Sequence, residues 1–482
     1  MREEECGQVT VFLGLLFITF LFVLSVCVEG IYVHMQSAAA VEAQMTAGAT
    51  AKANYHKELL EQFHIFAMDS RYVKKMDVLL KQNWTKNAGQ EAISWKSDER
   101  VAITQKEGEL LKKQISAYMK YAKAADIAED LKHALRAVQE NTKTDSLKQR
   151  LEEQTEEEGE TSSKEETKEK DQKTGEGTKE DPRKGLKKLL SKGILSVVMP
   201  EGANISDREI AIVYGKENMK KEKKINFFKK ESVSDYIESE DTQLAISKIT
   251  TEGLTCGYIE DVFHCALDHD IKSGINYEQE YLVAGKGSDA ENLKCVVNRI
   301  LLIRFCLNYT YLFSDTQKEA EAYALAAGIA NLASAIPGVL EAAKVLIMAA
   351  WAYGEAIVDL RALLKGEKIS VLKNAGNWQL SLSNLATLSA TTKPQENGIG
   401  YRDYLKVLIL LQSDRDQKYM RMMDVMEKRI KDTQPDFVLS EQIISFKLAI
   451  KTNLSSLFFQ QSYPREYEHI YEYGTSGAVF NF

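Results

Sequence analysis

The chain has 482 residues, of which 44% are hydrophobic and 27% are charged, and its formal net charge is -8. This composition, with only 6 Pro and 6 Cys, excludes a collagen, a small disulfide-stapled protein and a wholly disordered chain. At about 150 residues per domain, the length allows two or three folded units. The sequence contains no basic patch of the kind that binds phosphate backbones, so we expect no nucleic-acid partner.

A membrane-spanning helix is predicted near the N-terminus, because residues 9–28 contain no charged side chain. A helix of this length rises about 30 Å, which is the thickness of a bilayer hydrocarbon core. We therefore predict a cytoplasmic leader over residues 1–7 and a transmembrane helix over residues 8–28. Small residues at 37–40 also permit a cleaved signal peptide, but the acidic leader and the long apolar run favour a span.

The orientation of this span follows from the basic residues. Arg2 lies on the N-terminal side, whereas the other side has no Lys or Arg before Lys52. Positive charge favours the cytoplasmic side, so we expect a single-pass protein of the cell membrane with the bulk of the chain extracytoplasmic. Residues 36–57 contain no Pro and continue the helix outward as a stalk. An apolar stripe at helical spacing follows, formed by Leu59, Leu60, Phe63 and Phe66.

A charged insert interrupts the chain over residues 151–185. It contains 13 Asp and Glu against 7 Lys and Arg, a net charge of -6, and no hydrophobic residue after Leu151. Such a segment buries nothing that offsets the entropy of ordering it, so we predict a disordered linker. The predicted organisation is then a helical stalk and an N-terminal helical region over 29–150, this linker, and a head over 186–482.

The N-terminal helical region before the linker is predicted from an amphipathic pattern over residues 100–138, with Trp84 and Trp95 in the preceding connection. Its apolar face contains Leu110, Leu111, Ile115, Met119 and Ala122.

The head is predicted as α+β, mainly helical with a small antiparallel sheet. Strands are expected over residues 209–214, 277–284 and 444–450, and a closing hairpin around Gly474 and Gly477 in the tail. A helix capped by Ser288 and Glu291 is expected to bury Leu293, Val296, Val297, Ile300, Leu301 and Leu307. Further helices are expected over residues 339–364, 401–411 and 416–430, the last with a stripe of Met420, Met423 and Met426.

Two features of this head admit alternatives. Residues 322–340 are uncharged and could form a second span, but their Ala-rich composition and the Pro337-Gly338 pair favour a buried helical hairpin. Glu355 and Asp359 fall on one helix face, where paired carboxylates could do acid–base work. Arg361 and Lys365 nearby favour a solvated or salt-bridged edge instead.

Four cysteines fall outside the predicted membrane: Cys256, Cys265, Cys295 and Cys306. They permit two disulfides in an oxidising compartment, or four buried free thiols. Cys295 and Cys306 lie 11 residues apart on one predicted helix, about 16 Å in rise, so they cannot pair with each other.

The densest cluster of ligand-type residues is EDVFHCALDH, with Asp261, His264, Cys265, Asp268 and His269. On a helix, Asp261, Cys265 and His269 would align, although the spacing matches neither HExxH nor paired CxxC motifs. The same residue types also occur as ordinary polar residues on the surface of a helix, so we expect no metal and no cofactor. No nucleophile elbow, Walker loop or dinucleotide fingerprint occurs in the sequence.

The N-terminus resembles the start of pilin-like subunits of Tad (tight adherence) systems, of the TadE and TadG type. The resemblance rests on a short leader, on Gly7, and on the run Gln8-Val9-Thr10-Val11-Phe12 that enters a hydrophobic helix. It implies prepilin-type processing between Gly7 and Gln8, with Phe12 at the position where such subunits usually have Glu.

Longer stretches resemble a family of uncharacterised single-pass proteins of Gram-positive anaerobes that is found beside Tad pilus genes, a domain of unknown function. They include residues 57–72 (KELLEQFHIFAMDSRY) and, most closely, residues 281–312 (YLVAGKGSDAENLKCVVNRILLIRFCLNYTYL). The shared motifs are diffuse hydrophobic and aromatic patterns rather than catalytic signatures.

From residues and resemblance together, we expect a non-enzymatic, membrane-anchored structural or assembly protein, an accessory component of a Tad-type pilus or secretion system. Its expected partners are the lipid bilayer and other membrane, pilus or secretion subunits. The alternatives are a membrane-tethered enzyme or metal-binding module with a site in residues 261–269, and a surface-exposed binding or sensing module.

Overall fold

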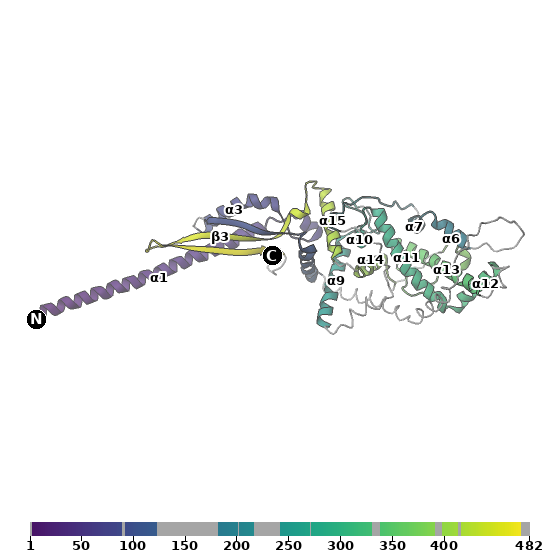
Figure 1. Ribbon diagram of the computed structural model, residues 1–482, viewed down its shortest axis with the longest axis horizontal. Coiled ribbons are helices and arrows are strands. Elements are labelled where there is room, and N and C mark those ends of the chain that lie inside the picture. Colours follow the sequence, from purple (N-terminus) through teal and green to yellow (C-terminus); the bar gives the residue numbers. More distant parts are fainter. Residues whose placement is uncertain are drawn as a thin grey trace, which may run out of the picture. The chain divides into compact units, whose positions relative to one another are not determined.

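The computed structural model describes residues 2–88, 92–122, 182–200, 202–215, 242–269, 271–329, 338–390, 398–412 and 416–473 (Figure 1). They fall into two compact units, which we call the sheet unit (Met1–Tyr118 and Gln434–Phe482) and the helical unit (Met119–Thr433). The α+β class and the small antiparallel sheet predicted from the sequence are confirmed.

The sheet unit begins with α1 (Arg2–Lys52), one continuous helix that contains the predicted span and most of the predicted stalk, which ends at Lys52 instead of continuing to Lys57. The elements after α1 are α2 (Lys57–Phe63), β1 (Met68–Asp69), α3 (Ser70–Ala88), β2 (Ala92–Ala102), η1 (Lys106–Gly108), a helix over residues 109–122, η4 (Leu439–Glu441), β3 (Gln442–Ser455) and β4 (Ser462–Glu472). Strands β3 and β4, from the C-terminal part of the chain, therefore lie in the same unit as α1.

Strand β3 is the centre of the sheet and pairs antiparallel with β1, β2 and β4. Its first residues are buried and the burial then alternates, as the predicted half-buried strand requires. The predicted helix from Arg100 is wrong at its start, because β2 pairs with β3 as far as Ala102 and the helix begins at residue 109. The predicted apolar face of that helix is confirmed at Leu110, Leu111, Ile115 and Met119, which are buried, but not at Ala122, which is exposed.

The apolar stripe after the stalk is only partly helical. Leu59 and Phe63 are buried on α2, but α2 ends at Phe63 because His64 adopts a left-handed conformation. Phe66 therefore lies beyond the helix, where its backbone N–H donates to Gln114 at 2.9 Å.

The C-terminal half of α1 packs on the sheet through small side chains. Its buried alanines recur every three or four residues and so form one face: Ala40, Ala43, Ala47 and Ala51. Gln44, on the same face, donates from Nε2 to the carbonyl of Leu448 at 3.1 Å. Tyr471 of β4 donates its hydroxyl to the carbonyl of Gln44 at 2.7 Å, which ties the helix to the hairpin.

Gly48 lies where α1 packs tightly against Tyr471 of β4. A Cβ at Gly48 would lie 1.8 Å from Cε1 of Tyr471, whose ring is buried and hydrogen-bonded. We expect Gly48→Ala to lower the free energy of unfolding of the sheet unit by about 1–3 kcal/mol, because the ring must leave its place. Urea denaturation of the full chain in detergent, followed by circular dichroism, measures this change.

Gly30→Ala is the matched control on the same helix, since a Cβ at Gly30 has no atom within 4 Å. It is expected to be neutral or to stabilise by up to about 1 kcal/mol, the helix-propensity gain of Ala over Gly. Equal effects of the two substitutions would contradict the close packing of α1 on β4.

The helical unit contains helices of very different length. They are α6 (Pro182–Leu190), α7 (Ile194–Val198), α9 (Thr242–Val262), α10 (Glu278–Ala284), α11 (Asp289–Ser314), α12 (Thr316–Ile329), α13 (Val339–Leu364), η3 (Leu382–Asn384), α14 (Tyr401–Leu410) and α15 (Gln417–Lys431). Most of the predicted linker lies outside the described residues, but its end is wrong, because Pro182–Gly185 form the start of α6.

Two predicted strands of this unit are wrong. Residues 277–284 form α10 and its N-cap, and every residue of α10 is buried, so no periodicity marks it as a helix. Residues 209–214 make only an isolated bridge between Glu209 and Ser288. The backbone N–H groups of Val213 and Tyr214 donate to the carboxylate of Asp424 instead of to a neighbouring strand.

The long helices are confirmed. Ser288 is the N-cap of α11, although its side chain makes no capping hydrogen bond, and the predicted apolar face is buried except at Leu307, which is half-buried. Met423 and Met426 of α15 are core residues, while Met420 is half-buried. Helices α12 and α13 pack against each other as the predicted hairpin requires, and Gly338 starts α13, but Pro337 lies outside the described residues. The hairpin is less buried than predicted, because Ala322 and Ala326 are the buried residues of α12.

The structure describes a hairpin that turns earlier in the chain than the predicted one. The partner of β3 is β4, and the chain turns over residues 456–461 between Ser455 and Ser462. The glycines expected to form the turn, Gly474 and Gly477, lie outside the described residues.

Candidate functional site

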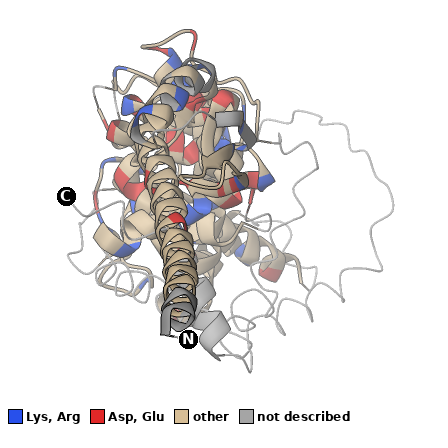
Figure 2. Ribbon diagram, turned by 90° about the vertical axis from the view of Figure 1, so that its left-hand side faces the viewer, with Lys and Arg blue, Asp and Glu red and all other residues tan. Residues whose placement is uncertain are grey.

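The N-terminal half of α1 exposes an apolar surface on all sides. From Val9 to Val28, all the Val, Leu, Ile and Phe side chains are exposed. Figure 2 shows this end of α1 free of charged residues beyond its grey tip. Among the described residues, α1 is the one helix long and apolar enough to cross a membrane. Gly7 and Gln8, the predicted processing residues, belong to α1 and directly precede this run in the sequence.

Glu29 sits directly after the apolar run and is buried. Its carboxylate accepts hydrogen bonds from the backbone N–H of Leu457, at 3.1 and 3.0 Å, and of Phe458, at 2.9 Å. Both donors belong to the turn between β3 and β4. Two turns further along α1, Gln36 donates to the carbonyl of Ser455 at 3.2 Å, so two side chains of α1 hold the end of the hairpin.

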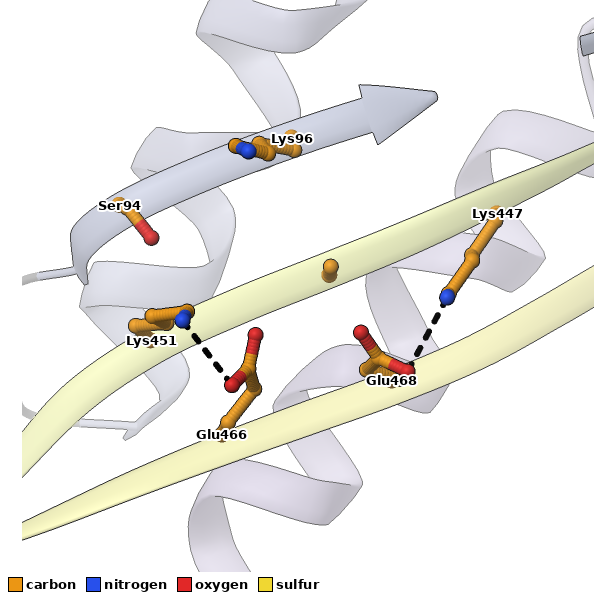
Figure 3. A pocket seen from close by; sticks show the side chains of 7 residues that line it. Ser94, Lys96, Lys447, Lys451, Glu466 and Glu468 are labelled. Atoms are coloured by element: carbon orange, nitrogen blue, oxygen red, sulfur yellow. Dashed lines mark ion pairs between the residues drawn. The ribbon is translucent and has the colours of Figure 1, made fainter. Parts of the chain in front are cut away.

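The sheet unit also has a charged outer face, drawn in Figure 3. A hollow of about 210 Å³ is lined there by Ser94, Lys96, Lys447, Ala449, Lys451, Glu466 and Glu468. Lys447 pairs with Glu468 at 3.1 Å and Lys451 with Glu466 at 3.0 Å, across neighbouring strands. The opposite charges within each cross-strand pair neutralise each other, so this face serves the pairing of β3 with β4 rather than the capture of a charged ligand.

The predicted cluster Asp261–His269 is not one helix. Helix α9 ends at Val262, so the expected alignment of Asp261, Cys265 and His269 is wrong. Asp261 and His269 are exposed, whereas Cys265 is buried. Asp268 accepts the backbone N–H of Cys265 at 2.8 Å and pairs with Arg402 at 2.5 Å. Among the described residues, no group of three His, Cys, Asp or Glu side chains is placed to hold a metal ion.

Two buried carboxylates that the sequence did not single out hold this loop. Glu278 of α10 accepts the backbone N–H of His264 at 2.9 Å and pairs with Arg429. Glu280 accepts the backbone N–H of Ala266 at 2.9 Å and the hydroxyl of Tyr401 at 2.7 Å. The two carboxylates therefore satisfy loop donors that would otherwise be buried without a partner.

Cys256, Cys265, Cys295 and Cys306 are all free thiols in the structure. Burial raises the pKa of Cys256 to about 12 and raises the pKa of Cys265 further. A thiol held in its neutral form is a poor nucleophile, so neither group is arranged for nucleophilic chemistry. Burial also lowers the pKa of His264, which keeps that imidazole neutral.

Glu355 and Asp359 do share a face of α13, and they are salt-bridged as one of the two predicted alternatives has it. The solvated alternative is wrong, and the partners are not Arg361 and Lys365. Both carboxylates are completely buried. Asp359 accepts two hydrogen bonds from Arg304 of α11, at 2.8 and 3.0 Å, and Lys373 bridges the two carboxylates. Arg361 donates instead to the backbone carbonyls of Val197 and Leu388.

The pKa values follow from this arrangement. Burial raises the pKa of Glu355, and Lys373 only partly offsets that effect. Burial acts in the same direction on Asp359, but Arg304 and Lys373 outweigh it and lower the pKa. Arg304 also donates to the carbonyl of Val371 at 2.9 Å, so the cluster joins α11, α13 and the segment after α13. We call Arg304, Glu355, Asp359 and Lys373 the buried ion cluster.

Glu280 makes the stability of the helical unit depend on pH. Burial raises the pKa of this completely buried carboxyl from 4.5 to about 7. The folded state binds the proton of Glu280 more tightly than the unfolded chain does, so protonation stabilises the folded state. This stabilisation is complete below about pH 4.5 and is lost as pH rises through about 7, a change of about 3 kcal/mol in the free energy of unfolding. Urea denaturation between pH 4.5 and 8 is expected to reveal it.

Glu280→Gln is expected to remove this pH dependence, since the amide oxygen still accepts the hydrogen bonds and no charge is buried. Glu341→Gln is the control, because the side chain of Glu341 is 60% exposed. An unchanged pH profile in Glu280→Gln would show that another group is responsible.

Comparison with known proteins identifies a family but no function. A protein-family model described as "Family of unknown function (DUF5702)" matches residues 131–454. No curated protein and no solved structure matches the chain.

Proposed function

The chain belongs to this family of unknown function, DUF5702, and from that premise we propose that it is a membrane-anchored structural or assembly protein. In this proposal α1 spans the cell membrane once, through residues 9–28. The rest of the chain lies on the extracytoplasmic side, and the stalk half of α1 holds the sheet unit just outside the bilayer.

The observation that supports the proposal most strongly is the exposure of the apolar half of α1. A helix that packs on a protein core is apolar on one face, whereas this one is apolar all round. Continuous exposed apolar surface of this extent is unfavourable in water and favourable in lipid. Beyond Glu29 the same helix changes to the one-sided alanine face of Ala40 to Ala51, which packs on protein.

A structural rather than catalytic role is supported by the chemistry of the helical unit. Its described buried charges have internal partners: Glu278 with Arg429, Glu252 with Lys418, and the members of the buried ion cluster with one another. Groups held in this way stabilise one conformation and are closed to a substrate.

We extend the proposal to an accessory role in a Tad-type pilus or secretion apparatus. Its support is the resemblance of the leader and the following apolar helix, from Gly7 onward, to pilin-type subunits. The mechanism is physical: the span retains the protein beside the apparatus, the stalk raises the folded units, and exposed surfaces bind partner subunits.

Measurements on the full-length protein in its native membrane test the two parts. Carbonate washing of membranes tests the anchor: the chain is expected to stay in the membrane fraction, and its release would refute the span. Protease treatment of intact cells tests the orientation: digestion of the chain from outside is expected. In-cell crosslinking with mass spectrometry tests the partners: Tad components are expected, and their absence in cells that assemble the pilus would refute the accessory role.

A further inference from the structure

The turn between β3 and β4 carries an apolar tip. Residues 456–461 read SLFFQQ, and Leu457, Phe458 and Phe459 are 50%, 52% and 37% exposed. Hairpin turns favour Gly, Asn, Asp and Ser, because these residues adopt the backbone conformations of a turn or hydrogen-bond to its backbone, and turns usually lie on the surface in water. Three consecutive large apolar residues at an exposed tip therefore indicate a non-aqueous environment.

The tip lies beside the apolar half of α1. The ring of Phe459 contacts that of Phe22 edge-on, with a centroid distance of 6.3 Å. Phe22 is seven residues before Glu29, so the tip reaches about 10 Å along the apolar run. In Figure 1 the β3–β4 hairpin runs beside α1 toward its N-terminal half.

Several backbone N–H groups of the turn have hydrogen-bond partners within the protein. Glu29 accepts the N–H groups of Leu457 and Phe458, and Ser456 accepts the N–H of Gln461 on Oγ at 2.7 Å. The N–H of Ser456 donates to the carbonyl of Gln461 at 3.1 Å, which closes the turn. Backbone groups near hydrocarbon must be satisfied within the protein, and these contacts satisfy the N–H groups of Ser456, Leu457, Phe458 and Gln461.

We propose that this tip is a second membrane contact, in which Leu457, Phe458 and Phe459 enter the outer interface of the bilayer next to the span. The occupant of the apolar surface is lipid, because the tip is continuous with the proposed transmembrane surface of α1. The inference rests on the proposed membrane anchor. Its consequence is that the sheet unit is held at two points, which restricts rotation and tilt of the unit about α1.

Tryptophan fluorescence of the full chain in phosphatidylcholine nanodiscs tests this contact, with lipids brominated on the acyl chains as quenchers. The variants are Phe458→Trp at the tip, Phe17→Trp within the span, and Ile470→Trp on β4. Ile470 is exposed as well, but lies about 27 Å further along the strand. The emission of the wild-type protein, which has 4 Trp, is subtracted.

The added emission of Phe458→Trp is expected to fall by about half or more in brominated lipid, as for a side chain about 5–10 Å inside the interface, while that of Ile470→Trp stays unchanged. Quenching of Phe17→Trp without quenching of Phe458→Trp would overturn the tip contact and leave the anchor standing. Protection of Phe458→Trp from both lipid bromine and aqueous iodide would also overturn it, since protein would then cover the tip. No quenching of Phe17→Trp would overturn the anchor itself.

Discussion

Replacing both Phe17 and Leu21 by arginine is expected to move the protein from the membrane fraction to the soluble or aggregated fraction. Both residues are exposed in the middle of the apolar run, one helical turn apart. Each arginine at the centre of a span costs about 2.5–3.5 kcal/mol, so two of them strongly disfavour insertion of the helix. Membrane retention after a carbonate wash measures the effect.

Val41→Arg with Met45→Arg is the matched control. These residues are also exposed, also lie one turn apart on α1, and follow the apolar run. The control should stay in the membrane fraction, because its charges remain in water. Equal loss of both double variants would mean that the arginines act by unfolding the chain rather than by blocking insertion.

Asp359→Ala is expected to destabilise the helical unit by about 3–5 kcal/mol, since it leaves Arg304 and Lys373 as buried cations without this carboxylate. The free energy of unfolding is a small difference between large terms, so this loss is a large part of it. Chemical denaturation of the full chain, followed by the fluorescence of the buried Trp351, measures the change.

Glu341→Ala provides the comparison for that substitution. Glu341 also belongs to an ion pair, with Lys344, but its side chain is 60% exposed. An exposed pair contributes at most about 1 kcal/mol, so only a small loss is expected. A loss for Asp359→Ala as small as that for Glu341→Ala would show that water reaches the cluster.

The elements that could be predicted from the sequence are those defined by local patterns. The apolar run of α1, the regular apolar spacing of α11 and the alternation in β3 each arise within one segment. The elements that could not be predicted lack such a pattern. Helix α10 is buried on every side, and its carboxylates Glu278 and Glu280 are stabilised by Arg429 and Tyr401, which lie more than a hundred residues away.

The candidate sites show the same division. The spacing of Glu355 and Asp359 predicts a shared helix face, but not whether water covers it. That depends on Arg304, which lies 55 residues from Asp359 in the sequence. In the cluster Asp261–His269, sequence spacing suggested one helix surface, whereas the end of α9 at Val262 separates the residues.

The sequence by itself determined the candidate span: where α1 becomes apolar, where the apolar run stops, and that the helix continues beyond it. These properties depend on about twenty neighbouring residues and on the thickness of a bilayer. Only the tertiary structure decided that β3 and β4 pack on the stalk half of α1, that Glu29 binds the β3–β4 turn, and that four distant charges form the buried ion cluster. Hydrogen bonds and ion pairs between distant segments have no local sequence pattern, because their partners meet only after the chain has folded.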